Sequence, residues 1–226
     1  FSNCTGLPKP TQYSCAKDVA KMLSEVVKHD EYFEYSKIWT DEIDHGGRKT
    51  EITNTNKLVR FYEGCDGGKT GYTAESGFCL AGTAKRGNMR LIAVVIKGES
   101  SKSRFADVSS AFNYGFDNYS SKAALDDEKE LSVTAKVEKG IKKDVKIIPE
   151  NDVYVFSKKN EKQDIVIDFE PYNKIKAPIK KGDKIGCLIV YKNGVETGRT
   201  NALAAETVNK KTYFDYVRDV ARSWTI

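Results

Sequence analysis

Two apolar runs joined by a glycine turn constrain the fold of this chain most strongly. The runs cover residues 78–86 and 90–97, and Gly87-Asn88 between them can take the positive φ of a tight hairpin turn. The second run contains Leu91 to Ile96, in which every residue is apolar. Strands that are buried on both faces have such continuous apolar sequences. The pattern therefore predicts an antiparallel hairpin whose second strand is a central strand, covered on both faces.

Helical and strand-like patterns divide the chain into three zones. Residues 1–122 mix both patterns, residues 123–206 form short strand-like runs between turns, and residues 207–226 are typical of one helix. The length of 226 residues suits one or two domains at ~150 residues each. We expect an α+β protein with a mixed first domain, a small all-β, sandwich-like second domain and a C-terminal amphipathic helix.

Local signals in the first zone predict its main elements. Ser14 precedes apolar residues at helical spacing, so we expect it to cap the N-terminus of a helix. Helical spacing returns over residues 104–119. Residues 44–49 should form a turn around their two glycines. The aromatic segment 32–40 is compatible with a strand or an irregular stretch.

Composition excludes several classes of protein. The net charge is +5, and the basic residues are scattered among acids, which argues against a nucleic-acid partner. No apolar run approaches the ~18 residues of a membrane span. The five cysteines form no Cys-x-x-Cys pair, and His29 and His45 are the only histidines, so we expect neither a metal site nor a cofactor. We interpret the cysteines mainly as small buried hydrophobes, with a structural disulfide as the less favoured alternative.

The segment Asp66 to Thr73, Asp-Gly-Gly-Lys-Thr-Gly-Tyr-Thr, carries the strongest chemical signal. One interpretation is a phosphate-binding loop, because that motif ends in Gly-Lys-Thr. That motif needs a glycine where this chain has Glu63, and Gly64 is off by one position. A helix should also follow, whereas here a hairpin is predicted. A nucleotide-binding protein is therefore the least favoured interpretation.

A Lys-Thr-Gly triplet on a strand edge fits the segment better. Lys69 supplies a fixed positive charge for a substrate carboxylate, and Thr70 supplies a hydroxyl donor to the same group. Gly71 leaves room for a substrate to lie against the strand. An extended peptide can add to such an edge by β-pairing. The triplet is one of three motifs of serine enzymes that recognise penicillin, together with Ser-x-x-Lys and Ser-x-Asn.

The surrounding sequence closely resembles the D-alanyl-D-alanine carboxypeptidases, the low-molecular-mass penicillin-binding proteins of bacteria. The resemblance covers nearly the whole chain. It is carried by Asn3, Thr5–Leu7, Tyr13–Ala20, Asn54–Leu58, Gly64–Thr73, Gly77-Phe78, Ala84–Arg86, Met89–Val95 and Ala177–Gly186.

The resemblance implies the last part of a transpeptidase-like catalytic domain over residues 1–122, a β-rich domain over 123–206 and the terminal helix over 207–226. It also implies a serine-type carboxypeptidase that removes the terminal D-alanine of peptidoglycan stem peptides and is acylated by β-lactams. Lys69, Thr70 and Gly71 would bind the terminal carboxylate. The backbone N–H of Tyr72 would be an oxyanion-hole donor, and Arg104 matches a family arginine near the carboxylate. The alternative for Arg104 is a surface salt bridge on its helix.

The chain departs from the family because its 226 residues contain no Ser-x-Asn. Its single Ser-x-x-Lys, Ser14 to Lys17, sits where the family has a helix-capping residue. We therefore expect the nucleophile to be absent from this chain, and the chain alone to be inactive. The missing part would cover one face of the sheet, so exposed apolar surface is expected. Cys65, close to Lys69, is a less favoured candidate for a reactive thiol.

Two further expectations concern partners and location. The terminal helix places Tyr213, Tyr216, Val217, Val220 and Trp224 on one face, which suits either contact with a membrane surface or packing on the protein body. The resemblance implies an extracytoplasmic protein of the bacterial cell envelope. A non-catalytic module that binds peptidoglycan or a partner protein through a carboxypeptidase-like fold is the alternative function.

Overall fold

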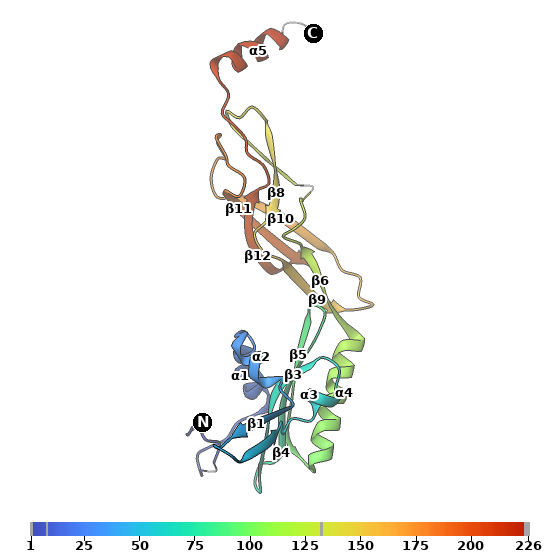
Figure 1. Cartoon of the computed structure of the whole chain (residues 1–226). Coiled ribbons are helices and arrows are strands. Elements are labelled where there is room, and N and C mark those ends of the chain that lie inside the picture. Colours follow the sequence, from blue (N-terminus) through green and yellow to red (C-terminus); the bar gives the residue numbers. More distant parts are fainter. Residues whose placement is uncertain (1, 8, 132, 224–226) are drawn as a thin grey trace. The chain divides into compact units, whose positions relative to one another are not determined.

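The computed structural model describes residues 2–7, 9–131 and 133–223. The chain divides into two compact units, residues 1–120 and residues 121–226, and each is described by itself (Figure 1).

A three-stranded antiparallel sheet forms the framework of the first unit. It consists of β3 (Cys65–Thr73), β4 (Gly77–Arg86) and β5 (Met89–Gly98), in the order β3-β4-β5. The predicted hairpin is confirmed, with Gly87 at a φ of 56° in the turn. The prediction of a central strand over Leu91 to Ile96 is wrong within the described residues, because β5 has one strand neighbour and β4 occupies the centre.

Helix α4 (Ser101–Asn118) covers one face of this sheet, as the spacing over residues 104–119 predicts. Val108 and Phe112 are fully buried against β4, and a Cβ at Gly82 would lie 3.2 Å from Val108. The helix begins with a capping box in which Ser100 and Ser103 satisfy each other's backbone N–H groups.

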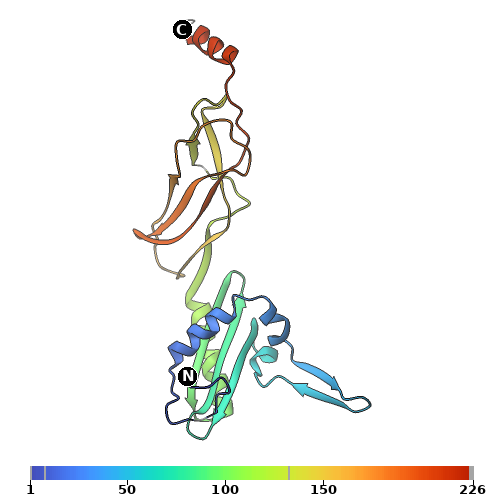
Figure 2. The ribbon, with the colours of Figure 1, turned by 90° about the vertical axis from the view of Figure 1, so that its left-hand side faces the viewer.

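Helix α1 (Ala16–Val26) packs on β5 and β4 and crosses the sheet face opposite α4 (Figure 2). Two helices therefore cover β5, which explains its apolar run although the strand lies at an edge. The prediction that Ser14 caps α1 is wrong. Cys15 is the N-cap residue, and its Sγ donates to Asp18 Oδ2 at 3.3 Å, so the helix begins one residue later than expected.

Short elements lie between α1 and β3. They are α2 (Glu31–Ser36), the hairpin strands β1 (Thr40–Asp44) and β2 (Lys49–Thr53), and the single-turn helix α3 (Leu58–Phe61). Segment 32–40 is thus largely helical, which the two predicted alternatives missed. The turn over 44–49 is confirmed, and Asp44 Oδ1 accepts from the Gly46 N–H at 2.8 Å.

The second unit is a β-structure with two sheets around one core. A five-stranded sheet has the order β10 (Ile165–Pro171), β11 (Lys184–Lys192), β12 (Val195–Ala204), β8 (Asp144–Pro149), β7 (Thr134–Lys136). The second sheet pairs β6 (Tyr119–Leu125) with β9 (Val153–Lys158). The core joins the two sheets through Leu125, Val155, Ile147, Leu188 and Val190. The sandwich-like expectation is confirmed.

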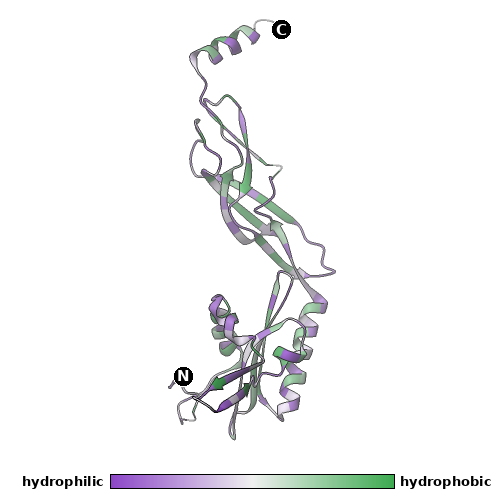
Figure 3. Ribbon diagram, in the orientation of Figure 1, coloured by the Kyte–Doolittle hydropathy of each residue, from purple (hydrophilic) through white to green (hydrophobic). Residues whose placement is uncertain are grey.

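Helix α5 (Tyr213–Ser223) ends the described chain. Thr212 and Asp215 cap its start, and Asp215 Oδ2 accepts from the Thr212 hydroxyl at 2.7 Å and from the Thr212 N–H at 2.9 Å. Apolar and polar residues alternate around its surface (Figure 3), and Tyr213 and Phe214 are strongly exposed. Trp224 of the expected apolar face lies outside the described residues. Over the described ranges, no helix is both long and apolar enough to cross a membrane.

Candidate active site

Strand β3 presents Lys69 and Thr70 on opposite faces of the sheet. Lys69 is paired with Ala81 on the face under α1 and is exposed, and its Nζ donates to the Thr70 carbonyl at 2.6 Å. Thr70 is paired with Leu80 on the α4 face and is buried, and its hydroxyl donates to Thr55 Oγ1 at 2.8 Å. The Lys-Thr-Gly triplet thus lies on a strand, as predicted, with its charge in solvent and its hydroxyl partly shielded.

The backbone of β3 turns the Tyr72 N–H toward the edge that lies away from β4. Arg104 Nη1 donates to the carbonyls of Gly71 (3.1 Å) and Cys79 (3.3 Å), which are paired residues, so both oxygens lie between β3 and β4. Backbone groups of neighbouring strand residues alternate in direction. The N–H groups of Thr70 and Tyr72 therefore face the outer edge, where an oxyanion-hole donor and a β-paired peptide would both need them.

Arg104 lies under the strand rather than in solvent. It is 8% exposed, and its guanidinium stacks near the rings of Phe105 (4.9 Å) and Phe78 (5.5 Å). Its Nε is buried without a hydrogen-bond partner, and no carboxylate of the described chain forms a salt bridge with it. The alternative of a surface salt bridge is therefore wrong. Arg104 is a buried cation that has backbone carbonyls but no counter-ion, close to the predicted carboxylate site.

A cleft of about 710 Å³ lies beside the triplet on the α1 face. Lys69 and Gly71 line it from β3, Val19 and Met22 from α1, and Val94 and Ile96 from β5. The cleft therefore combines one cationic end with an apolar wall, and this wall is the exposed apolar surface that we expected on the sheet.

The outer edge of β3 is partly closed by side chains that sequence analysis did not single out. The Gly68 N–H donates to the Tyr32 hydroxyl at 2.8 Å, and Ser36 Oγ donates to the Asp66 carbonyl at 2.7 Å. The buried Asn56 donates from Nδ2 to the Gly67 carbonyl at 3.1 Å, on the side away from this edge, because that carbonyl points opposite to the Gly68 N–H of the same peptide unit. Tyr32 and Ser36 belong to α2, the helix that was not predicted, so no local signal could reveal these bonds.

Arg90 fixes the start of β3 from β5, the other edge strand, at the same end of the sheet. It forms a bidentate pair with Asp66 at 2.9 and 2.8 Å, and its Nη1 also donates to the Thr83 hydroxyl at 2.8 Å. Its guanidinium lies 4.3 Å from the centroid of the Phe33 ring. Asp66 is thereby neutralised, which leaves the charge of Lys69 uncompensated within the described structure.

The other sequence candidates show no sign of an activated nucleophile. Ser14 lines the cleft, but its hydroxyl donates to the neighbouring Cys15 carbonyl at 3.5 Å, and Lys17 does not line the cleft. Burial raises the pKa of the Cys65 thiol to about 11, the opposite of activation, so the reactive-thiol alternative is wrong. His29 and His45 do not line this cleft.

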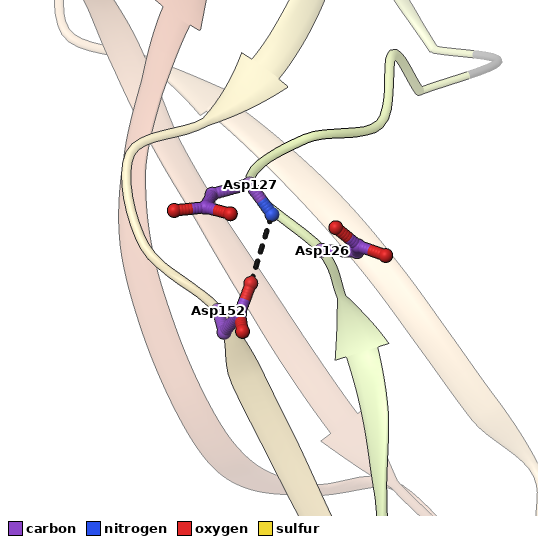
Figure 4. Close-up of side chains that lie close together, drawn as sticks. All are labelled: Asp126, Asp127 and Asp152. Atoms are coloured by element: carbon purple, nitrogen blue, oxygen red, sulfur yellow. Dashed lines mark hydrogen bonds between the residues drawn. The ribbon is translucent and has the colours of Figure 1, made fainter.

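In the second unit, three carboxylates gather at the end of β6 and the start of β9 (Figure 4). Asp126 binds Lys129, and Asp152 accepts from the Tyr154 hydroxyl at 2.6 Å and from the Asp127 N–H at 2.9 Å. These bonds account for the grouping without an ion, and we assign no metal site to it.

Comparison with known proteins relates each unit of the chain to a described family or domain. The D-alanyl-D-alanine carboxypeptidase family matches residues 1–100, and the C-terminal domain of penicillin-binding protein 5 matches residues 119–210. Over most of its length the chain is therefore similar to the C-terminal part of D-alanyl-D-alanine carboxypeptidases. The carboxypeptidase DacF of Bacillus subtilis is 32% identical over the whole chain, and DacC of Escherichia coli is 29% identical over 97% of it. The chain spans little more than half of these relatives, 58% and 54% of their lengths.

Solved structures support the same fold. Penicillin-binding protein 5 from Haemophilus influenzae matches 93% of this chain and 61% of its own, with a TM-score of 0.64 and 26% identity. The match to penicillin-binding protein 3 of Streptococcus pneumoniae covers 82% of this chain and 54% of that protein, with a TM-score of 0.66 and 21% identity. At this identity the match supports the fold alone. The expected α+β class, with a β-rich C-terminal domain, is confirmed.

Proposed function

We propose that this chain supplies the carboxylate-binding part of a serine-type D-alanyl-D-alanine carboxypeptidase, which removes the terminal D-alanine of peptidoglycan stem peptides. The observation that carries the proposal is the arrangement on β3. A cation at Lys69 without a carboxylate partner among the described residues, a hydroxyl at Thr70 and an outward N–H at Tyr72 lie within four residues of this strand. This set suits a peptide that ends in a carboxylate.

Electrostatics favour the same ligand. A buried guanidinium without a counter-ion is costly, and a bound anion offsets that cost. Arg104 lies directly under Gly71, so a carboxylate at the Lys-Thr-Gly edge would be attracted by two cations rather than one. Asp66 does not oppose this attraction, because Arg90 pairs with it. In this proposal Lys69, Thr70 and Gly71 contact the carboxylate, while Arg104 acts through the strand.

We further propose that the 226-residue chain does not hydrolyse the peptide by itself. A nucleophile needs an adjacent base, and Ser14 has a backbone carbonyl as its hydrogen-bond partner. A role as a non-catalytic binding module is the second candidate, because the carboxylate-binding groups are present in the chain without a nucleophile among them.

Intact-mass measurement before and after incubation with excess penicillin tests the inactivity. The expected result is no adduct. A single penicilloyl adduct, mapped to a serine of this chain, would contradict it.

Titration of the ¹⁵N-labelled chain with D-Ala-D-Ala tests carboxylate binding. We expect shifts of the Lys69 to Tyr72 amides with the free acid and none with the C-terminal amide, because the amide removes the charge that Lys69 and Arg104 attract. Lys69→Gln should raise the dissociation constant obtained from these shifts about tenfold, because one charge-assisted hydrogen bond is lost. Equal shifts with acid and amide would contradict the proposal.

The family also suggests partners and location beyond the peptide. We propose that β-lactams are ligands of the complete site and that the protein acts outside the cytoplasm, at the bacterial cell envelope. Contact of α5 with a membrane surface is part of this proposal, because its aromatic and aliphatic side chains are exposed beside basic residues.

A further inference from the structure

The outer edge of β3 has a closed half and an open half. From Asp66 to Gly68, two backbone groups of this edge are bonded to side chains of α2: the Asp66 carbonyl to Ser36 at 2.7 Å and the Gly68 N–H to Tyr32 at 2.8 Å. From Thr70 onward, no other strand of the described chain pairs with this edge. The boundary falls at Lys69, the first residue of the triplet.

We propose that Tyr32 is a positioning residue that, with Ser36, closes the β3 edge up to Gly68 and so allows an extended peptide to pair only from Thr70 onward. This inference rests on the proposed function and adds what sets the register of the peptide. A peptide that slid one pair of residues toward Asp66 would need the Gly68 N–H, which already has a partner. Loss of that bond without replacement would be unfavourable, so the slid register is disfavoured.

Gly67 shows that the closed half is tightly built. A Cβ at this position would lie 2.7 Å from Ser36 Oγ and 2.8 Å from the Tyr32 hydroxyl. No side chain fits there without displacing the two α2 groups from the edge. The first glycine of Asp-Gly-Gly-Lys-Thr-Gly is therefore required by the closed edge, and its role is distinct from that of Gly71 beside the ligand.

The Tyr32 hydroxyl is itself held in place. Burial is the main cause that raises its pKa, and the Gly68 N–H and Ser36 act against this shift. The hydroxyl therefore stays protonated and can both accept from Gly68 and donate elsewhere. A tyrosine is needed for this contact, since phenylalanine keeps the ring and removes the acceptor.

Amide hydrogen exchange of the full chain tests the closed edge without any ligand. We expect the Gly68 amide to be protected and the Tyr72 amide to exchange rapidly. Tyr32→Phe should accelerate Gly68 exchange at least tenfold and leave Leu80 and Ala84, in the middle of the sheet, unchanged. The matched control is Tyr35→Phe on the same helix. The Tyr35 side chain is 73% exposed, so this substitution should leave the exchange rate of the Gly68 amide unchanged.

Two results of this experiment would overturn the closed edge. One is a Gly68 amide that exchanges as fast as Tyr72 in the unaltered chain, and the other is a Tyr32→Phe chain with Gly68 still protected. If Tyr32→Phe also accelerates exchange of the Leu80 and Ala84 amides, Ser36→Ala is used in its place. Its readouts are the exchange rate of the Gly68 amide and the chemical shift of Gly67. An unchanged Gly68 and Gly67 in that variant would overturn the closed edge too.

A peptide titration tests the register. With a tripeptide ending in D-Ala-D-Ala, we expect amide shifts at Thr70 and Tyr72 in the unaltered chain, and additional shifts at Gly68 in Tyr32→Phe. Shifts at Gly68 already in the unaltered chain would overturn the positioning role while leaving carboxylate binding intact. No shift in either chain would overturn the proposed function and the positioning role together, and the exchange data would then describe a structural bond alone.

Discussion

At the scale of single residues, Arg90 connects more parts of the first unit than any sequence signal suggested. Its guanidinium joins β5 to Asp66 at the start of β3 and to Thr83 in β4, and it stacks on Phe33 of α2. Both partners of the ion pair are about one-quarter exposed, so the pair is shielded more than a surface pair. Removal of one partner leaves the other poorly solvated.

Arg90→Ala should therefore destabilise the first unit by about 2–4 kcal/mol. The control is Lys28→Ala, which breaks a strongly exposed pair with Glu25 and should cost less than about 0.5 kcal/mol. Urea midpoints followed through the Leu80 amide signal measure both. Equal effects of the two substitutions would show that the Asp66 pair is an ordinary surface pair.

The buried thiol of Cys65 makes stability depend on pH in the alkaline range. Burial raises its pKa from 9.0 to about 11 in the folded chain. Between these values the unfolded chain has released the thiol proton and the folded chain retains it, so stability falls as pH rises. From about pH 8 to about pH 10.5, the loss attributable to Cys65 should be on the order of 1 kcal/mol.

Cys65→Ala isolates this contribution, because other groups titrate equally in both chains. The variant is less stable at neutral pH, since a buried side chain is truncated, but its stability should fall less steeply between the two pH values. Urea unfolding at both pH values gives the comparison. Identical pH slopes for the two chains would contradict the assignment.

At the scale of elements, the contact of α4 with β5 depends on a helix residue without a side chain. A Cβ at Gly115 would lie 2.4 Å from Leu91 Cδ1, closer than packed atoms approach. Glycine is otherwise unfavourable inside a helix by about 1 kcal/mol relative to alanine. The close approach of helix and strand explains why glycine stands there.

Gly115→Ala should thus destabilise the first unit by about 1–3 kcal/mol despite the gain in helix propensity. Ser110→Ala, on an exposed position of the same helix, should be neutral or slightly stabilising. Thermal unfolding of both variants measures the difference. A stabilised Gly115→Ala chain would mean that Leu91 moves aside at little cost.

Helix α5 carries its own prediction. Val217→Asp places a charge on the apolar face, where Val217 is 49% exposed, and should weaken binding to vesicles with anionic lipid at least tenfold. Arg218→Gln is the comparison, because loss of one charge near such a surface costs about 1 kcal/mol and can be offset by lower salt. Vesicle sedimentation measures both. A Val217→Asp chain that binds the vesicles as tightly as the unaltered chain would contradict insertion of the apolar face.

At the scale of the whole molecule, the chain has two separate hydrophobic cores. One surrounds Phe112 and Leu80 in the first unit, and the other surrounds Leu188 and Val145 in the second. No residue belongs to both clusters among those the structure describes. Each unit therefore has the apolar interior that independent folding requires.

Calorimetry should resolve two unfolding transitions that respond to different substitutions. Phe112→Ala should lower the free energy of unfolding of the first unit alone, by about 3–5 kcal/mol. Leu188→Ala should lower that of the second unit alone, by about 2–5 kcal/mol, because both side chains are fully buried. A shift of both transitions by either substitution would show that the units unfold together.

Much of the fold followed from local patterns along the sequence. The Gly87 hairpin, the helix over residues 104–119 and the strand-rich zone of residues 123–206 were predicted because turn residues and apolar periodicity act over a few neighbours. The start of α1 was missed by one residue, since Ser14 and Cys15 compete for the cap. Helix α2 was missed because its aromatic residues suit a strand equally well.

The sequence by itself determined the resemblance to the carboxypeptidases, the Lys-Thr-Gly strand and the chemistry offered at Lys69 and Thr70. These depend on residue type and on spacing within one segment. Tertiary structure alone decided that β4 is the central strand, that Arg104 lies under Gly71 and that Tyr32 holds the Gly68 N–H. Those contacts join residues 33 and 36 positions apart, and burial and hydrogen bonds over such separations exist only once the chain has folded.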